Sequence, residues 1–334
     1  MVKGLERYEA INRGEAVAKF QIAKRIEAEW AESFEDMKTI HDRLKKEFRK
    51  MDADTSLLKD EPAKYSFLHL KRDMLYEMLR ECNFCERRCG VNRFEKKGFC
   101  KCGVTSYFSS EFLHVGEEPE LIPSHTIFFN RCTFACVFCQ NYDIVYEDDY
   151  VADPRELAYL IDRRYRQGSR NVNFVGGNPD QHAHTISEIL LNVESNIPVV
   201  WNSNMYHSTE LAEIIEDLVD VWLGDFKYGN DDCAKKYSKV PKYWKVVTRN
   251  FLRAKDNGEL LIRHLVLPNH IECCTEPIAK WVAENLGGDT RFNLMFQYYP
   301  TFKAWEYKEI SRRLNAEEMK RALEIAERYL SNLV

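Results

Sequence analysis

Short apolar runs alternate with amphipathic stretches through the second half of the chain. The runs are rich in Val, Ile, Phe and Trp, which favours strands, and the stretches between them repeat apolar residues every three to four positions, which favours helices. The predicted strands are 126–129, 171–175, 198–201, 219–223, 260–266 and 292–297. The predicted helices start near Pro154 and cover 180–194, 208–217, 243–256, 275–286 and 315–331. Six such units predict a parallel sheet with helices outside, closed or partly closed into a barrel.

The first 80 residues have a different pattern. Glu, Lys, Arg, Ala and Leu dominate this stretch, and apolar residues recur at helical spacing, as at Ile22, Ile26, Trp30, Phe34 and Met37. The pattern predicts two or three amphipathic helices, interrupted at 51–56, where Asp54, Thr55 and Ser56 are candidate caps. The stretch has no catalytic motif. Packing against the rest of the chain is favoured over dimerisation or binding of a partner.

Residues 81–120 are rich in cysteine and glycine. Their C-x2-C-x3-C-x10-C spacing is formed by Cys82, Cys85, Cys89 and Cys100, and Cys102 is an alternative fourth ligand. A loop-rich segment of this size needs a staple to fold, so we predict a closed site of four thiolates that holds zinc or an iron–sulfur cluster. The domain prediction is a helical extension at 1–80, a metal module at 81–120 and a barrel at 121–334.

Composition limits the class of protein and the cellular compartment that we expect. The 334 residues are 45% hydrophobic with a net charge of −5, which is ample for a core and gives no global case for nucleic-acid binding. We find no apolar run long enough to cross a membrane and no signal-peptide pattern, so we expect a cytoplasmic protein. Eight of the 11 cysteines lie between residues 82 and 139 in short spacings, which in a reducing compartment favours metal binding over disulfides.

The most informative pattern is the C-x3-C-x2-C run of Cys132, Cys136 and Cys139, which follows the first predicted strand of the barrel. A 4Fe-4S cluster wants four thiolates, so three of them leave one iron open to a ligand from outside the protein. A zinc knuckle or ordinary buried cysteines are the alternatives. Zinc is disfavoured because the nearest histidine, His125, lies before the strand.

This spacing, with Phe138 directly before the third cysteine, resembles the signature of the radical S-adenosylmethionine (SAM) superfamily. The resemblance implies a partial (β/α)6 barrel of TIM type, with the cluster loop after its first strand. It also implies that SAM chelates the open iron, and that one electron from a reductant such as flavodoxin or ferredoxin splits SAM into methionine and a 5′-deoxyadenosyl radical.

The ends of the later predicted strands carry further elements that resemble those of the superfamily. Gly176, Gly177 and Asn178 resemble the element that contacts the SAM amino group. Asp225 with Lys227, and Arg263, match segments that help to bind SAM in pyruvate formate-lyase activating enzymes, and Arg263 suits a bidentate contact with the SAM carboxylate. The full set of predicted cofactor-binding residues is Phe138, Gly176, Gly177, Asn178, Asn202, Ser203, Asn204, Asp225, Lys227, Arg263 and Gln297.

Segments 116–119, 126–129 and 136–142 resemble a particular branch, the radical SAM proteins related to pyruvate formate-lyase activating enzyme, and the likeness covers about residues 82–330. It implies an enzyme that abstracts hydrogen from an unactivated C–H bond. The substrate is a glycyl radical enzyme, another protein or peptide, a small molecule or a lipid, and the likeness tilts towards a protein. The alternatives are a non-enzymatic iron–sulfur or zinc protein that carries electrons or acts as a scaffold, and a non-radical methyltransferase, which leaves the three cysteines unexplained.

Overall fold

The computed structural model describes residues 3–51, 54–116 and 118–334, and within them one mixed sheet has the strand order β3-β1-β2-β4-β5-β6-β7-β8. From β2 to β8 the neighbouring strands are parallel, whereas β1 pairs antiparallel with both β2 and β3. The strands are β1 (Tyr107–His114), β2 (Ser124–Phe129), β3 (Tyr150–Val151), β4 (Val172–Gly176), β5 (Val199–Ser203), β6 (Val221–Asp225), β7 (Glu259–Leu265) and β8 (Arg291–Met295). The six parallel strands confirm the predicted partial barrel, whereas the antiparallel strands β1 and β3 were not predicted.

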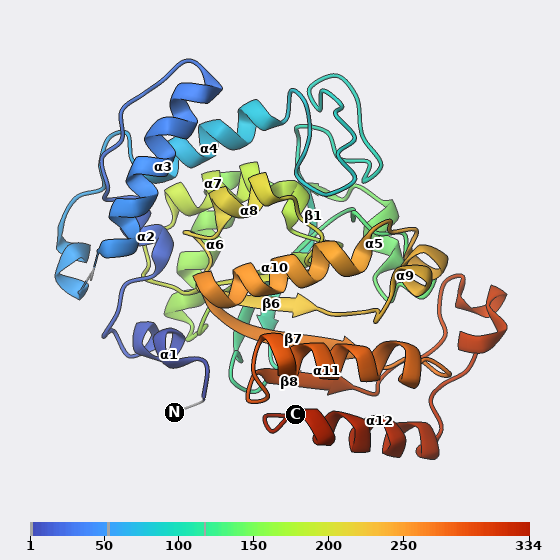
Figure 1. The fold of residues 1–334 in the computed structure, drawn as a ribbon. Helices are drawn as coiled ribbons and strands as arrows, with labels where there is room; N and C mark the ends of the chain where they lie inside the picture. Colours follow the sequence, from blue (N-terminus) through green and yellow to red (C-terminus); the bar gives the residue numbers. More distant parts are fainter. Residues whose placement is uncertain (1–2, 52–53, 117) are drawn as a thin grey trace.

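Helices lie outside the parallel strands, and the arrowheads of β6, β7 and β8 point towards α5 and α9 (Figure 1). Local signals define several helix starts: Asp153 caps α6 ahead of Pro154, and Asn315 and Glu318 form a capping box at α12. The helices of this part are α5 (Tyr142–Tyr146), α6 (Pro154–Arg166), η2 (Asp180–His182), α7 (Ala183–Asn192), α8 (Thr209–Ile215), α9 (Asp231–Ser238), α10 (Tyr243–Asn257), η3 (Ile271–Thr275), α11 (Glu276–Asn285), η4 (Ala304–Glu306), η5 (Lys308–Ile310) and α12 (Ala316–Tyr329).

The end of the barrel where the strands begin is closed by an apolar plug. Residues of β5, β6 and β7 form a separate buried cluster with Leu5, which precedes α1 (Glu6–Asn12), and with Tyr8 of α1. The Glu259 carboxylate accepts hydrogen bonds from the backbone N–H groups of Arg7 and Tyr8, at 2.6 and 2.7 Å, which holds the start of α1 in place. This packing fills the end of the barrel opposite the carboxyl ends of the strands, where barrels of this kind place their chemistry.

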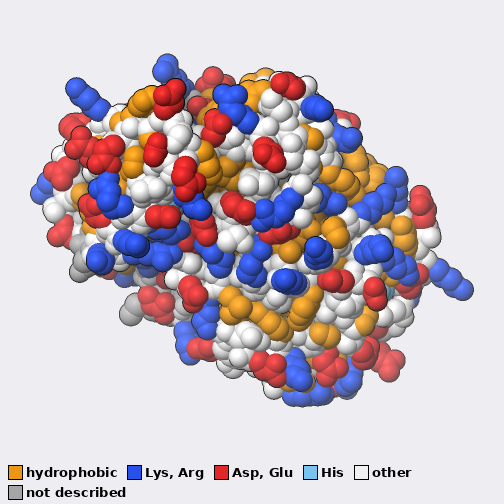
Figure 2. All heavy atoms as spheres, turned by 45° about the horizontal axis from the view of Figure 1, so that its top comes forward, with side chains coloured by type: hydrophobic (Ala, Val, Ile, Leu, Met, Phe, Trp, Pro, Cys, Tyr) orange, Lys and Arg blue, Asp and Glu red, His pale blue; other side chains and the backbone are white. Residues whose placement is uncertain are grey.

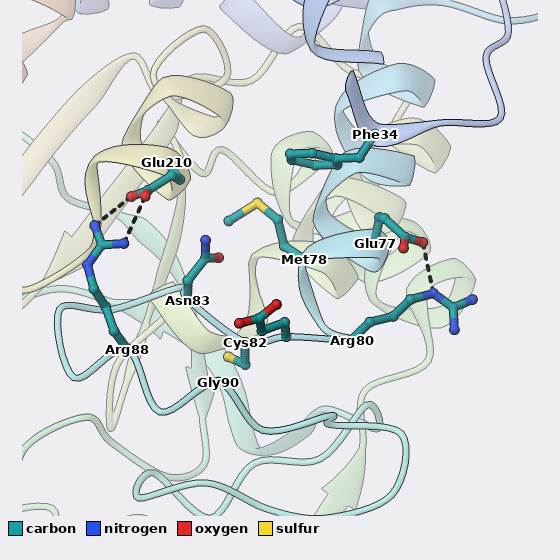
Figure 3. Close-up of a pocket in the computed structure, with 10 residues that line it drawn as sticks. Phe34, Glu77, Met78, Arg80, Cys82, Asn83, Arg88, Gly90 and Glu210 are labelled. Atoms are coloured by element: carbon teal, nitrogen blue, oxygen red, sulfur yellow. Dashed lines mark hydrogen bonds and ion pairs between the residues drawn. The ribbon is translucent and has the colours of Figure 1, made fainter. Parts of the chain in front are cut away.

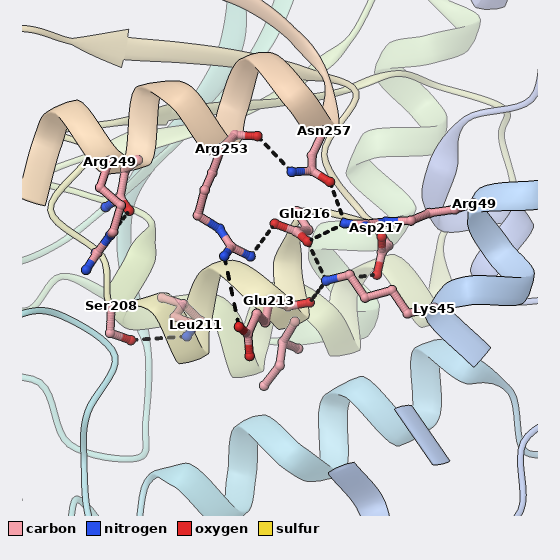
Figure 4. A network of polar contacts seen from close by, with 12 residues as sticks. Lys45, Arg49, Ser208, Leu211, Glu213, Glu216, Asp217, Arg249, Arg253 and Asn257 are labelled. Carbon is pink, nitrogen blue, oxygen red and sulfur yellow. Dashed lines mark hydrogen bonds and ion pairs between the residues drawn. The ribbon is translucent and has the colours of Figure 1, made fainter. Parts of the chain in front are cut away.

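The N-terminal arm packs against the barrel, as its pattern favours. It contains α1, α2 (Lys19–Ala23), α3 (Phe34–Lys50), η1 (Thr55–Lys59) and α4 (Phe67–Met78), and Asp54 caps η1. Lys45 of α3 pairs with Glu216 after α8, and Figure 4 shows this contact within a wider ionic network. The fully buried Lys71 ammonium lies 2.8 Å from Asp217. Burial opposes ionisation of Asp217, but Lys71 and Lys45 hold the pKa of its carboxyl below the usual value.

In the part of the chain that the structure describes, no helix combines the length and apolar character needed to cross a membrane. Acidic and basic side chains are interspersed over the face drawn in Figure 2, so this face presents no broad region of one sign.

Candidate active site

A cavity of about 200 Å³ lies at the carboxyl ends of the parallel strands. Among its lining residues, Gly176 ends β4, Asp225 ends β6 and Arg263 lies two residues before the end of β7, while Asn204 directly follows β5. The predicted residues in the cavity wall are Cys132, Cys136, Phe138, Cys139, Gly176, Gly177, Asn204, Asp225, Lys227 and Arg263. The structure thus brings ten predicted residues from five separate segments to one place.

The loop that carries the three cysteines is held by backbone contacts with α9. The N–H groups of Ala135 and Val137 donate to the carbonyl oxygens of Ser238 and Tyr237, at 3.0 and 2.8 Å. On the other side, the Lys303 N–H donates to the Val137 carbonyl at 2.8 Å. These bonds fix the loop by its main chain, so its cysteine side chains are free to point into the cavity.

Hydrogen-bond donors face two of the three sulfurs. Ser238 Oγ lies 2.9 Å from Cys136 Sγ, and the Phe134 N–H lies 3.3 Å from Cys132 Sγ. Burial raises the pKa of all three thiols, that of Cys139 to about 12, while the nearby Lys227 ammonium opposes this rise. Thiolates in such a buried place need a positively charged centre, and this donor set fits an iron–sulfur cluster.

Lys227 is the cationic group nearest to this loop in the wall. Its ammonium lies 2.7 Å from Asp225 Oδ2, and its backbone N–H donates to the Tyr243 hydroxyl at 2.8 Å. Burial lowers the pKa of Lys227, but the Asp225 carboxylate and the Cys136 thiol outweigh it and hold the pKa above its usual value. The side chain is therefore a fixed positive charge at the cavity.

Gly176 and Gly177 are required by close backbone packing. Gly176 has φ +110°, and a Cβ there would lie 2.1 Å from the Phe129 carbonyl oxygen. A Cβ at Gly177 would lie 1.8 Å from the Arg131 carbonyl oxygen. Only glycine lets β4 end against the start of the cysteine loop, so these residues set the position of the loop as well as lining the cavity.

The other polar residues at the ends of β4 and β5 divide into two groups. Asn204 faces the cavity, where its Nδ2 lies 3.7 Å from Cys132 Sγ, and its backbone N–H donates to Asn178 Oδ1 at 3.0 Å. Ser203 is turned the other way and donates to the buried Asp180 carboxylate at 2.9 Å. Asn178 and Ser203 therefore support the wall from behind, while Asn202 lines a neighbouring cavity.

That neighbouring cavity, of about 260 Å³, lies deeper in the barrel and shares Gln140, Asn141 and Arg263 with the first. Arg263 Nε donates to Glu118 Oε1 at 2.6 Å, and Asn293 donates to the same oxygen at 3.0 Å. Burial disfavours the Glu118 carboxylate, yet Arg263 holds its pKa below the usual value. Glu118 belongs to segment 116–119 of the sequence analysis, in which Glu117 lies outside the described residues.

Sequence reasoning missed the partnership of Arg263 with Glu118, which are 145 residues apart. It also missed Met295, Gln140 and Asn141, which line the cavity. Met295 is the last residue of β8, and a position at a strand end was the signal that could have identified it. The predicted strand ended at 297 instead, so Gln297 was chosen as the site residue. Gln297 is exposed and is not among the lining residues.

The cysteine-rich module packs beside this site, on the loop after β5. The N–H of Glu86 donates to the Tyr206 carbonyl at 3.2 Å, and the N–H of Ser208 donates to the Phe84 carbonyl at 3.1 Å. Within the module, Cys89 Sγ lies 3.9 Å from the Cys82 carbonyl oxygen, and Cys102 Sγ lies 3.6 Å from the Cys100 carbonyl oxygen. Cys100 and Cys102 both remain candidates for the fourth ligand.

A larger cavity, of about 610 Å³, lies away from the strand ends, between the arm and the module. Figure 3 shows Phe34 and Met78 on one side of it and Arg88 with Glu210 on the other. Arg88 pairs with Glu210 at 2.8 Å, and Arg80 pairs with Glu77 at the same distance. Both arginines of this wall are thus paired with carboxylates, and none of the predicted SAM-binding residues lines it, so the smaller cavity at the strand ends is the candidate active site.

Comparison with known proteins agrees with this site. Residues 126–282 match the model of the radical SAM superfamily. The chain is 46% identical over 341 residues to the uncharacterized protein MJ0674 of Methanocaldococcus jannaschii, and the match covers 99% of each chain.

Among solved structures, SuiB of Streptococcus suis bound to S-adenosylmethionine gives a TM-score of 0.48 at 14% identity, covering 61% of this chain and 47% of SuiB. The chain thus matches about half the length of SuiB. Methylornithine synthase (PylB) gives a TM-score of 0.44 at 13% identity, covering 97% of this chain and 77% of that one. Both scores are under 0.5, so the family assignment rests on the sequence match.

Proposed function

Because the chain belongs to the radical SAM superfamily, whose members use a 4Fe-4S cluster and SAM, we propose that it cleaves SAM reductively at the strand-end cavity and abstracts hydrogen from an unactivated C–H bond of a substrate. The observation that carries this proposal is the convergence of Cys132, Cys136 and Cys139 with Asp225 and Lys227 in one cavity wall. An electron carrier needs three or four thiolates but has no use for the ion pair beside them.

The three cysteines would hold the cluster. When bound, the cluster supplies the electron that splits SAM into methionine and a 5′-deoxyadenosyl radical. Ser238 and the Phe134 N–H would stabilise charge on the sulfurs through the hydrogen bonds already described. An external one-electron donor such as flavodoxin or ferredoxin would reduce the site.

The cationic groups of the wall would orient SAM. Lys227 and Arg263 present positive charge to one cavity, which suits the SAM carboxylate. Each is held by a carboxylate, Asp225 or Glu118, and this restricts where the cation points. Asn204 and the backbone of Gly177 add neutral hydrogen-bonding groups to the same wall. The cavity is thus arranged to bind one zwitterionic ligand in one orientation.

The deeper cavity is the proposed place for the reacting part of the substrate. Its lining is rich in hydroxyl and amide groups, including Ser124, Thr126, Asn173 and Asn202. It adjoins the SAM cavity through Arg263, so a radical formed in one cavity has a short path to the other. The relationship to pyruvate formate-lyase activating enzymes, and with it a protein substrate, stays a prediction from the sequence.

We propose that the cysteine-rich module holds its own iron–sulfur cluster. A single zinc ion gathers its ligand atoms tightly, whereas a cluster spreads its cysteines over several irons. Among the described residues, one group alone brings three His, Cys, Asp or Glu ligand atoms within 4.8 Å of one another, and it includes neither the module nor the Cys132 loop. This spacing supports clusters at both places.

The test is an anaerobic comparison of the reconstituted wild type with a variant in which Cys132, Cys136 and Cys139 are all alanine. Iron and sulfide are counted, and 5′-deoxyadenosine is assayed after addition of SAM and dithionite. We expect about eight irons in the wild type and about four in the variant, with 5′-deoxyadenosine formed by the wild type alone. The iron that the variant keeps in the module serves as the internal control for folding.

The opposite result would show equal iron in the two proteins and no 5′-deoxyadenosine from either. The three cysteines would then not hold a catalytic cluster, and the electron-carrier or scaffold interpretation would replace the enzyme.

A further inference from the structure

A second group of metal-binding side chains lies outside the cavity. Cys233 of α9 meets His270 and Cys273 of the turn after β7, and the ligand atoms of these three residues all lie within 4.8 Å of one another. Cys274 is not one of these three residues, but its Sγ lies 4.0 Å from Cys273 Sγ. One tetrahedral zinc ion, with Zn–S near 2.3 Å and Zn–N near 2.0 Å, places its ligand atoms about 3.6–3.8 Å apart. The group is therefore close to the size that a single ion requires.

The histidine of this group is oriented for metal binding. His270 Nδ1 lies 2.7 Å from the Pro268 carbonyl oxygen, and a hydrogen bond there places the ring hydrogen on Nδ1. The Tyr237 hydroxyl lies 3.0 Å from His270 Nε2 but donates its hydrogen to Glu309 at 2.6 Å. With its hydrogen on Nδ1, the ring would offer the Nε2 lone pair to a metal ion in place of the Tyr237 contact. A metal-bound histidine typically donates its second nitrogen to a carbonyl in this way.

The surrounding backbone holds the cysteines close together. Asn230 caps α9 by accepting from the Cys233 N–H at 2.8 Å, and its Nδ2 donates to the Cys273 carbonyl at 2.8 Å. A Cβ on Gly229 would lie 2.6 Å from that same carbonyl oxygen, so the loop before α9 and the turn after β7 are packed in direct contact.

We propose that Cys233, His270, Cys273 and Cys274 bind one zinc-type metal ion. The tight spacing of Cys233, His270 and Cys273 separates this site from the two proposed clusters, and Cys274 is the proposed fourth ligand. Cys273 is exposed and Cys233 is half-buried, so the ion can enter from solvent, while the buried Cys274 closes the inner side.

The position of the site indicates what the ion does. The ion joins α9 to the turn after β7, two segments that are distant in the sequence. The last two residues of α9, Tyr237 and Ser238, accept the backbone hydrogen bonds of the Cys132–Cys139 loop. A metal at Cys233, one helical turn before Tyr237, therefore anchors the helix on which the proposed cluster loop rests. This role is structural, and the proposal does not depend on SAM cleavage.

The first test examines the intact holoprotein, purified anaerobically from cells supplied with zinc. Zinc is counted for each chain, and X-ray absorption at the zinc edge identifies its ligands. We expect about one zinc with three sulfur ligands and one imidazole. The imidazole distinguishes this site from the module, whose predicted ligands are all cysteines. Absence of zinc, or a shell of four sulfurs without imidazole, overturns the proposal.

The second test compares two full-length variants. Cys233→Ser combined with Cys273→Ser removes two ligands, and Glu272→Gln changes an exposed neighbour that is not in the group. The double variant should lose its zinc and keep its iron, whereas Glu272→Gln should keep both. Equal zinc in the double variant and the wild type overturns the proposal. If the double variant does not fold, the X-ray absorption spectrum of the wild type still tests whether zinc is bound by three sulfurs and one imidazole.

Discussion

The Cys132–Cys139 loop and the Cys82–Cys102 module use the same ligand for different purposes. The loop has three cysteines, lies at the ends of the barrel strands, and shares a cavity wall with Asp225 and Lys227. The module has five cysteines in irregular chain, and its backbone contacts run to the loop after β5. Neither Cys85 nor Cys100 lines the strand-end cavity.

The difference shows how the surroundings of a thiolate decide its role. Backbone bonds to α9 and the close approach at Gly177 support the loop, so its shape does not depend on a metal. The module has no helix or strand between α4 and β1 in the part that the structure describes, and a metal group would supply its missing folding energy. We therefore expect substitutions in the loop to remove activity and substitutions in the module to remove stability.

The largest effect should come from Cys136→Ala. One iron of the proposed cluster loses its protein ligand, while the loop keeps its contacts with Tyr237 and Ser238. We expect loss of 5′-deoxyadenosine formation to background and a melting temperature close to that of the wild type. Full activity in this variant would contradict the proposed mechanism.

Cys85→Ala is the matched substitution in the module. Removing one of four ligands should release the metal of the module and lower the thermal stability of the whole chain, because the module packs on the loop that carries Asn204 and Tyr206. The measurements are metal content and thermal unfolding under anaerobic conditions. A Cys85→Ala protein that keeps its metal and its melting temperature would show that the two regions do not differ in this way.

Lys227→Met should produce an intermediate effect. The change removes the cation beside Cys136 and leaves Asp225 without its partner, so SAM should bind about 10–100-fold more weakly, as expected for hydrogen bonds to charged groups worth about 1.5–3 kcal/mol. Lys239→Met makes the same chemical change at an exposed position outside the cavity. Calorimetric titration of both anaerobic holoproteins with SAM measures the difference, and equal dissociation constants would exclude Lys227 from SAM binding.

The site residues that could be predicted from the sequence are those that lie close to one another along the chain. Cys132, Cys136 and Cys139 lie in one short run, and Asp225 and Lys227 are two residues apart, so their local spacing located them. The alternating apolar pattern likewise located all six parallel strands. Such patterns work because strand ends in a parallel barrel meet at one edge.

Partners joined only by tertiary packing left no such pattern. Glu118 reaches Arg263 across 145 residues, and Cys233 meets His270 only because the loop at Gly229 packs on the turn after β7. Strand β1 was missed because its residues are partly buried almost throughout and show no clear alternation. Ser203 and Asn204 are consecutive residues at the end of β5, so their side chains point to opposite faces. Ser203 faces Asp180, whereas Asn204 faces the cavity.

The smallest effect should come from Ser238→Ala, which changes the surroundings of one sulfur in the loop and leaves all cysteines in place. Its hydroxyl lies 2.9 Å from Cys136 Sγ, and loss of this hydrogen bond makes the thiolate richer in electrons and the proposed cluster harder to reduce. A hydrogen bond worth about 1 kcal/mol corresponds to a reduction potential lower by about 40 mV for one electron.

Redox titration followed by electron paramagnetic resonance measures this shift. Ser187→Ala is the control, because Ser187 is a buried serine whose hydroxyl donates to the His184 carbonyl and not to a sulfur. The potential should fall for Ser238→Ala alone, and only for the signal that the Cys132, Cys136 and Cys139 variant lacks. If the signal of the module shifted instead, Ser238 would be acting on the cluster of the module and not on that of the loop. The contrast between the loop and the module would then be wrong.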